Sequence, residues 1–112
     1  MRKIEQRIIH AIDKRQSVTL SQRDQVRTID NVIIVTLWNT DIVKIYFNED
    51  GLFEKMVLSN GGYQTVTTKS RINAILRHFN FDQIYQKNFE WVWPSNFIKD
   101  STGYRDIYVY PV

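Results

Sequence analysis

The sequence predicts a single α+β domain in which an antiparallel sheet of about five to six strands packs against two helices. Three observations support this prediction. The chain has 112 residues, enough for one core. Hydrophobic residues make up 43% and charged residues 24%, a balance typical of globular and not of disordered chains. Apolar residues recur with a helical period in two segments and in β-branched or alternating runs elsewhere.

The amino-terminal segment predicts a helix followed by a short strand. Ile4, Ile8 and Ile12 recur at helical spacing among charged residues, which indicates an amphipathic helix over about residues 2–15. Residues 17–20 alternate polar and apolar side chains, as a half-buried strand does. We expect residues 21–25 to form a polar connection.

The middle of the chain predicts three adjacent antiparallel strands. Residues 32–38 form a dense β-branched run, which favours a central strand. Residues 42–47 continue as a second strand after a break at 39–41. Residues 48–51 end in Asp-Gly, a pair typical of hairpin turns, and residues 52–58 form the returning strand.

A second helix is indicated after the turn at residues 59–62. Its apolar stripe consists of Ile72, Ile75, Leu76 and Phe79, spaced i, i+3, i+4 and i+7. The hydroxyl of Thr67 or Thr68 is the expected N-cap, and Asn80 the expected end. Three strands are expected beyond it, over residues 83–87, 89–93 and 104–110.

Several function classes lack support in the sequence. Cysteine is absent, so neither disulfides nor thiolate chemistry are expected. His10 and His78 lie far apart, and we find neither a phosphate-binding loop nor a nucleophile elbow. We therefore expect no enzyme, no metal and no cofactor. Without a long apolar run, the expected location is the cytoplasm of a host cell.

The segment from Thr65 to Asn73 is the principal candidate site. Two cations at a helix start oppose the helix macrodipole, and together with threonine hydroxyls and free amides they could bind a phosphate or carboxylate. The predicted anion, nucleic-acid or partner contacts are Tyr63, Thr65, Thr67, Thr68, Lys69, Arg71 and Asn73. The alternative is a threonine N-cap beside solvated cations.

Aromatic side chains form two further candidate groups. Strand alternation would place Phe89, Trp91 and Trp93 on one face, where they could enter the core or stack on unpaired bases. A tyrosine-rich face of the last strand could form a protein interface or a dimer contact. It could equally belong to an edge strand with one partly solvated face. The tyrosines of this face are Tyr104, Tyr108 and Tyr110.

The segment at residues 61–73, GGYQTVTTKSRIN, resembles a motif of small bacteriophage and plasmid proteins, Gly-Trp-x-Thr-x-Thr-Thr-Lys-x-Arg-hydrophobic-Asn. Tyr63 replaces the usual Trp and keeps an aromatic plane. Ile4-Glu5, Ala11-Ile12, Asn39-Thr40 and the segment 85–91 extend the resemblance to about residues 3–93, leaving residues 95–112 as an additional strand. The resemblance implies a mobile-element origin but no particular activity.

Three functional hypotheses follow. The first is a non-enzymatic phage protein that inhibits a host nucleic-acid machine, such as an RNA-guided nuclease, in the manner of anti-CRISPR proteins. Its partner would be a host defence nucleoprotein or its DNA or RNA. The second is a general single-strand or duplex nucleic-acid binder. The third is a homodimeric structural module.

Overall fold

The computed structural model describes residues 2–62, 64–99 and 106–111. Its two helices and nine strands follow one another along the chain in this order: α1 (Lys3–Asp13), β1 (Val18–Thr19), β2 (Asp24–Ile29), β3 (Val32–Leu37), β4 (Thr40–Phe47), β5 (Phe53–Leu58), α2 (Val66–His78), β6 (Tyr85–Lys87), β7 (Glu90–Val92), β8 (Ile98–Lys99) and β9 (Ile107–Val109).

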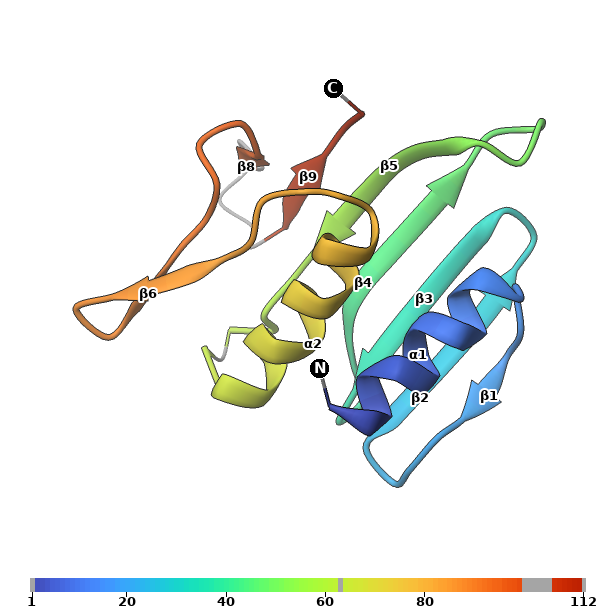
Figure 1. The fold of residues 1–112 in the computed structure, drawn as a ribbon, viewed down its shortest axis with the longest axis horizontal. Coiled ribbons are helices and arrows are strands. Elements are labelled where there is room, and N and C mark those ends of the chain that lie inside the picture. The colour runs from blue at the N-terminus through green and yellow to red at the C-terminus, as the bar shows by residue number, and fades with distance from the viewer. Residues whose placement is uncertain (1, 63, 100–105, 112) are drawn as a thin grey trace.

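Seven strands form one antiparallel sheet in the order β1-β2-β3-β4-β5-β9-β8 (Figure 1). The first five follow chain order, and β9 then pairs with β5. Strands β6 and β7 form a separate hairpin. The predicted α+β class is therefore confirmed, and the sheet is larger than predicted.

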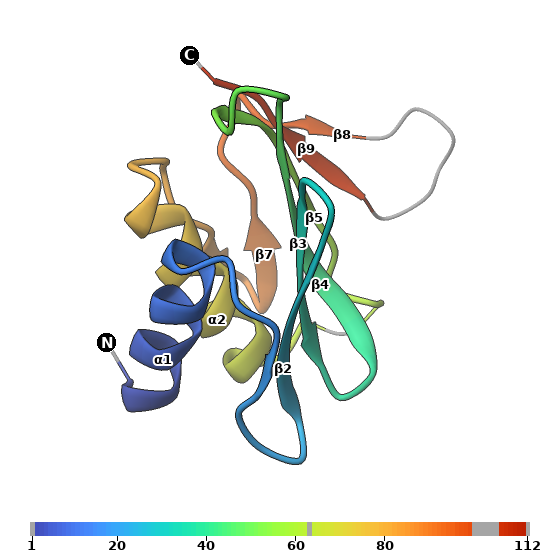
Figure 2. The same cartoon turned by 90° about the vertical axis from the view of Figure 1, so that its right-hand side faces the viewer.

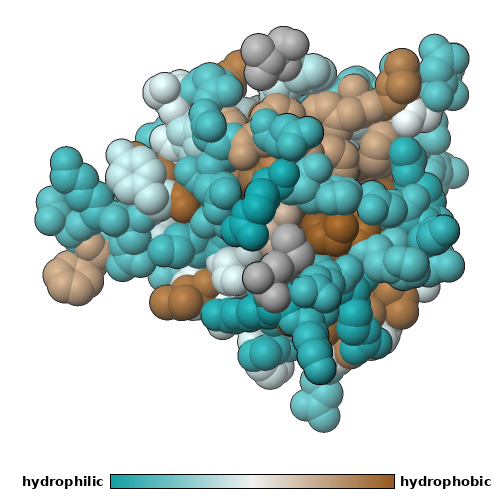
Figure 3. All heavy atoms as spheres, in the orientation of Figure 1, coloured by the Kyte–Doolittle hydropathy of each residue, from teal (hydrophilic) through white to brown (hydrophobic). Residues whose placement is uncertain are grey.

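Both helices lie on the same face of the sheet (Figures 1 and 2). Helix α1 contacts α2 and β2, and α2 also contacts β4. The core between the layers is built from the isoleucine stripes of the helices and the inward side chains of the strands. It includes Ile8, Ile12, Ile33, Ile45, Leu58, Ile72 and Ile75. Hydrophilic side chains predominate on the outer surface of this helical layer (Figure 3).

The predicted meander over residues 32–58 is confirmed as β3, β4 and β5. The predicted connection over residues 21–25 overlaps the start of β2, and no strand was predicted over residues 24–29, which include the charged Asp24 and Arg27. Both side chains are paired in the structure, Asp24 with Arg71 and Arg27 with Asp41. The first two residues of the predicted last strand (104–110) lie outside the described residues, and within 106–110 the observed strand is Ile107–Val109.

Two tight turns explain why two predicted strands are shorter than expected. Between β3 and β4, Trp38 and Asn39 have φ angles of 51° and 64°. Between β6 and β7, Asn88 and Phe89 have φ angles of 51° and 66°. Paired positive φ angles are typical of the two-residue type I′ turn, so Trp38 and Phe89 belong to turns and not to strands.

Candidate functional site

The start of α2 is capped by Thr65, so the expectation that Thr67 or Thr68 caps it is wrong. The Thr65 side chain accepts a hydrogen bond from the backbone N–H of Thr68 at 3.1 Å. The hydroxyls of the two residues lie 2.8 Å apart. The two hydroxyls therefore hydrogen-bond to each other, and the Thr65 hydroxyl also accepts from one of the backbone N–H groups that the first turn of the helix leaves free.

Arg71 is buried, which removes it from the predicted anion site. Its side chain has 0% exposure. Its Nη1 donates to Glu5 Oε2 and its Nε to Asp24 Oδ1, both at 2.8 Å. The guanidinium thus joins α1, β2 and α2, and a solvent anion has no access to it.

The two carboxylates of this cluster are held in their ionised form. Burial alone would raise the pKa of Glu5, but hydrogen bonds from Ser70 and Arg71 outweigh it and leave the pKa lowered. Burial likewise opposes ionisation of Asp24, while hydrogen bonds from Arg71 and Ser21 leave its pKa lowered. The three charged groups form a structural ion triad with no free ligand position for an external anion.

Other residues of the motif also hold the fold together. Asn73 donates to the Ile84 carbonyl at 2.9 Å and accepts from the Ile84 N–H at 2.7 Å. Gly61 lies against Thr40, and a Cβ at Gly61 would come within 2.6 Å of Thr40 Cγ2. Gln64 accepts from the Trp91 N–H. The motif therefore connects α2 to the strands and to the segment that follows α2.

The remaining cations of α2 offer little of the predicted contact surface. Lys69 is half-buried, and its Nζ lies 3.5 Å from Gln86 Oε1. Thr67 is half-buried, and Tyr63 lies outside the described residues. His78 contacts Asp13 at 2.8 Å, and Arg77 donates to Gln83. The structure therefore does not gather these side chains into one basic site.

The aromatic group of residues 89–93 divides between core and surface. Trp91 is buried and packs edge-to-face with the half-buried Trp93, their ring centroids 5.7 Å apart. Phe89 is 91% exposed at the tip of the β6–β7 hairpin. The prediction that these three side chains share one strand face is wrong, because Phe89 lies in the turn.

The side of the sheet opposite the helices carries a different surface, here called the open face. Strand pairing places six of its residues in one row across six strands. In order across the sheet the row consists of Arg27, Ile34, Lys44, Val57, Tyr108 and Ile98. At the usual spacing of neighbouring strands, the row spans about 24 Å.

A second row runs beside the first. Its paired members are Ile29, Val32, Tyr46 and Lys55. Tyr110 lies two residues beyond Tyr108, and the two rings stack at 13° with centroids 6.5 Å apart. The Lys55 ammonium lies 4.9 Å from the centroid of the Tyr46 ring. The open face therefore alternates cationic, aliphatic and aromatic side chains.

The centre of the open face is positive. Arg27 is paired with Asp41 at 3.0 Å. Within the described residues, neither Lys44 nor Lys55 has a carboxylate partner. Asp106, which precedes β9, also lies on this face by strand alternation from Tyr108. Two lysines among tyrosines can contact phosphates while the rings stack on bases.

Two of the three tyrosines predicted as a possible interface belong to this surface. Tyr108 and Tyr110, predicted as a possible interface, lie on the open face, and Tyr104 lies outside the described residues. Lys44, Tyr46 and Lys55 were missed. Strand alternation within the correctly predicted meander could have identified them, since all three project opposite to the buried Ile45 and Met56.

The described residues contain no group of three or more His, Cys, Asp or Glu side chains suited to a metal ion. In the same part of the chain, neither helix has the length and apolar character needed to cross a membrane.

Comparison with known proteins identifies one family. No curated protein and no solved structure matches the chain. The family model described as Kyanoviridae Gp96 protein matches residues 1–108. The matched range includes residues 95–108, which the motif resemblance does not reach. The chain therefore belongs to the Kyanoviridae Gp96 family, a family of bacteriophage proteins.

Proposed function

We propose that this phage protein is a non-enzymatic binding protein that holds single-stranded nucleic acid on the open face of its sheet. The main supporting observation is that Lys44 and Lys55 lie beside Tyr46, Tyr108 and Tyr110 on the side of the sheet opposite both helices (Figure 2). Sheets with exposed aromatic rings bind single strands by stacking, and nearby cations neutralise the phosphates.

The composition of the open face favours nucleic acid over a protein partner or a homodimer. Lysine is depleted at protein interfaces, yet two lysines occupy the centre of this surface. Pairing two open faces about a twofold axis would bring these lysines of both copies together, and the like charges would repel. A polyanion is the partner whose charge complements this surface.

A binding titration tests the proposal. Fluorescence anisotropy would measure the affinity for labelled oligo-dT and oligo-U of about twelve nucleotides, a length within the usual range of single-strand sites. We expect the slope of log K against log salt to become shallower by about 0.7 for each lysine lost. The test variant is Lys44→Glu combined with Lys55→Glu.

The matched control is Arg77→Glu combined with Lys87→Glu, which changes the net charge equally at exposed positions away from the open face. We expect Tyr110→Ala to lose about 1–3 kcal/mol of binding free energy, the usual contribution of one stacked base. Equal affinity and salt slope in all variants would refute the proposal.

Membership of a bacteriophage family supports a second proposal, namely that the protein acts against a host nucleic-acid machine such as an RNA-guided nuclease. The test is target cleavage by a purified nuclease with and without the protein. We expect inhibition by the native protein and by the Arg77/Lys87 control, and loss of inhibition in the Lys44/Lys55 variant. Cleavage unaffected by the native protein would refute this role for that nuclease.

A further inference from the structure

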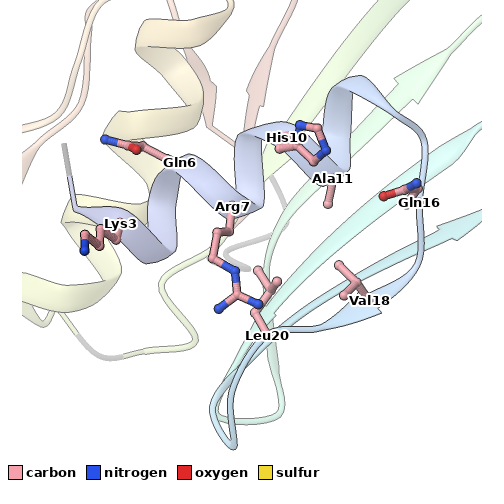
Figure 4. Close-up of a pocket in the computed structure, with 8 residues that line it drawn as sticks. All are labelled: Lys3, Gln6, Arg7, His10, Ala11, Gln16, Val18 and Leu20. Atoms are coloured by element: carbon pink, nitrogen blue, oxygen red, sulfur yellow. The ribbon is translucent and has the colours of Figure 1, made fainter.

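A groove runs between α1 and the edge strand β1, on the helical side of the sheet (Figure 4). Its volume is about 490 Å³. The apolar part of its lining consists of Ala11, Val18 and Leu20. Lys3, Arg7 and His10 line it from the helix, spaced i, i+4 and i+7 so that they form one stripe.

The groove is open to a polymeric ligand along the edge of the sheet. Strand β1 is the terminal strand of the described sheet and pairs only with β2. The Leu20 N–H donates to the Asp24 carbonyl, so the backbone groups of Leu20 point toward β2. In a strand, the backbone groups of neighbouring residues point to opposite sides. The backbone groups of Thr19 therefore point away from β2, where a further strand could pair with them.

The charge around the groove is of one sign. Its lining includes no Asp or Glu. Lys3 and Arg7 are exposed, and neither makes an ion pair with any described residue. Glu5 is buried against Arg71, and Asp13 contacts His78. A ligand with negative side chains could therefore pair with Lys3 and Arg7, and no carboxylate in the groove lining would repel it.

We propose that this groove binds an extended acidic peptide segment of another protein, which adds to β1 as a further strand. Alternate side chains of such a strand would point toward α1, where acidic ones meet Lys3 and Arg7 and apolar ones meet Val18 and Leu20. Backbone pairing would supply affinity and the charged stripe would select the sequence.

Other occupants fit the groove less well. Its lining has no aromatic ring on which a base could stack, and its apolar side chains are aliphatic. Two copies of this chain pairing through β1 would bring their Lys3–Arg7 stripes together, and like charges would repel. The groove and the open face lie on opposite sides of the sheet, so this inference does not depend on the proposed nucleic-acid binding.

The experiment uses the full chain labelled with ¹⁵N and a capped peptide of alternating Glu and Val, about eight residues long to match a typical strand. Amide shifts are followed during titration. We expect the largest shifts at Thr19, its neighbours and α1. Peptides with Gln or Lys in place of Glu serve as charge controls, and we expect them to bind more weakly.

Two variant pairs locate the interaction. Thr19→Pro removes the outward N–H, whereas Thr19→Ala removes the same side-chain contacts and keeps that donor, so we expect binding to weaken only in the proline variant. Lys3→Glu combined with Arg7→Glu should weaken binding about tenfold, while Arg77→Glu combined with Lys87→Glu should not. Thermal melting checks that each variant is folded.

Three results would overturn the proposal. The first is the absence of shifts in β1 and α1 with the acidic peptide. The second is equal binding of the acidic, neutral and basic peptides. The third is a response of the groove amides to oligo-dT in place of the peptide, which would assign the groove to nucleic acid.

Discussion

Arg71 illustrates at the residue scale what local sequence patterns miss. A cation in the first turns of a helix normally faces water, and nothing within residues 65–73 indicates otherwise. Its partners Glu5 and Asp24 lie 66 and 47 positions away in the sequence. The one available signal was that Glu5 and Arg71 both lie in segments that resemble the small phage and plasmid proteins. The candidate site at α2 was therefore a structural cluster, and reversing the charge of Arg71 would test folding and not binding.

Replacement of Arg71 by Met should destabilise the protein strongly. The variant keeps much of the side-chain volume but leaves Glu5 as a buried carboxylate without its cation, and leaves Asp24 with only Arg23, 3.4 Å away. Breaking a buried ion pair in this way costs about 3–5 kcal/mol, which urea unfolding can measure. Lys69→Met is the control, because Lys69 makes one long contact at the surface. Similar stability of the two variants would contradict the structural role of the triad.

The triad also predicts that the protein loses stability in acid. The folded-state pKa values of Glu5 and Asp24 lie below their ordinary values of 4.5 and 3.8. The unfolded chain therefore binds more protons than the folded protein in this range. The free energy of unfolding should be highest above the ordinary values and should fall as the pH drops through them toward the lowered ones.

Chemical unfolding at a series of pH values would measure this dependence. In Glu5→Gln one of the two titrating groups is absent, so the slope between about pH 5 and 3 should be shallower, although the variant is less stable overall. An unchanged slope would show that Glu5 is not held ionised by Ser70 and Arg71.

Gly61 provides a second test at this scale. Its φ of +65° is strained for residues with a Cβ, and the added methyl of Gly61→Ala would meet Thr40 Cγ2 at 2.6 Å. We expect a loss of about 1–3 kcal/mol. Thr40→Ser removes Cγ2, so combining it with Gly61→Ala should recover the steric part of the loss in a double-mutant cycle. Additive effects would show that the contact is not the cause.

At the scale of elements, periodicity predicted the structure where one face of an element is buried. Helix α1 and the meander β3–β5 have that character, and they lie within one or two residues of the predicted ranges. Strand β2 was not predicted, and two of its six residues are charged. The groups that neutralise Asp24 and Arg27 lie on other elements, Arg71 on α2 and Asp41 on β4. The sequence of residues 24–29 alone therefore does not indicate that these charged residues can belong to a packed strand.

The hairpin of β6 and β7 contains an unfavourable turn residue whose replacement should stabilise it. Phe89 has a φ of 66° and is 91% exposed, so its ring makes little contact that could offset the strain. Phe89→Gly would create Asn-Gly, the preferred type I′ sequence. We expect a gain of about 1 kcal/mol in thermal or urea unfolding. Phe89→Leu, which keeps a Cβ, should not give this gain.

At the scale of the whole molecule, the sequence predicted the two layers but not the strand order. Insertion of β9 between β5 and β8 depends on a contact between residues about fifty positions apart, and no local pattern encodes it. The same limit applies to the open face, whose rows combine residues from six strands. Tyr108 and Tyr110 were predicted as an interface, but the lysines beside them become neighbours only in the assembled sheet.

The carboxyl-terminal strand should contribute to the stability of the whole domain. Ile107 of β9 is 5% exposed, whereas Ile98 of β8 is 54% exposed. Ile107→Ala should cost about 2–5 kcal/mol and Ile98→Ala less than about 0.5 kcal/mol, as measured by urea unfolding. Equal small effects would indicate that β9 is a dispensable addition to the sheet.

The meeting of Glu5, Asp24 and Arg71 also has a kinetic consequence. Hairpins such as β3–β4 close short loops and can form early, whereas the triad joins three distant segments, and closing long loops is entropically costly. Burial of the guanidinium before both carboxylates arrive would be unfavourable, so the two helices should dock late. Substitutions in the triad should therefore accelerate unfolding while leaving the refolding rate nearly unchanged.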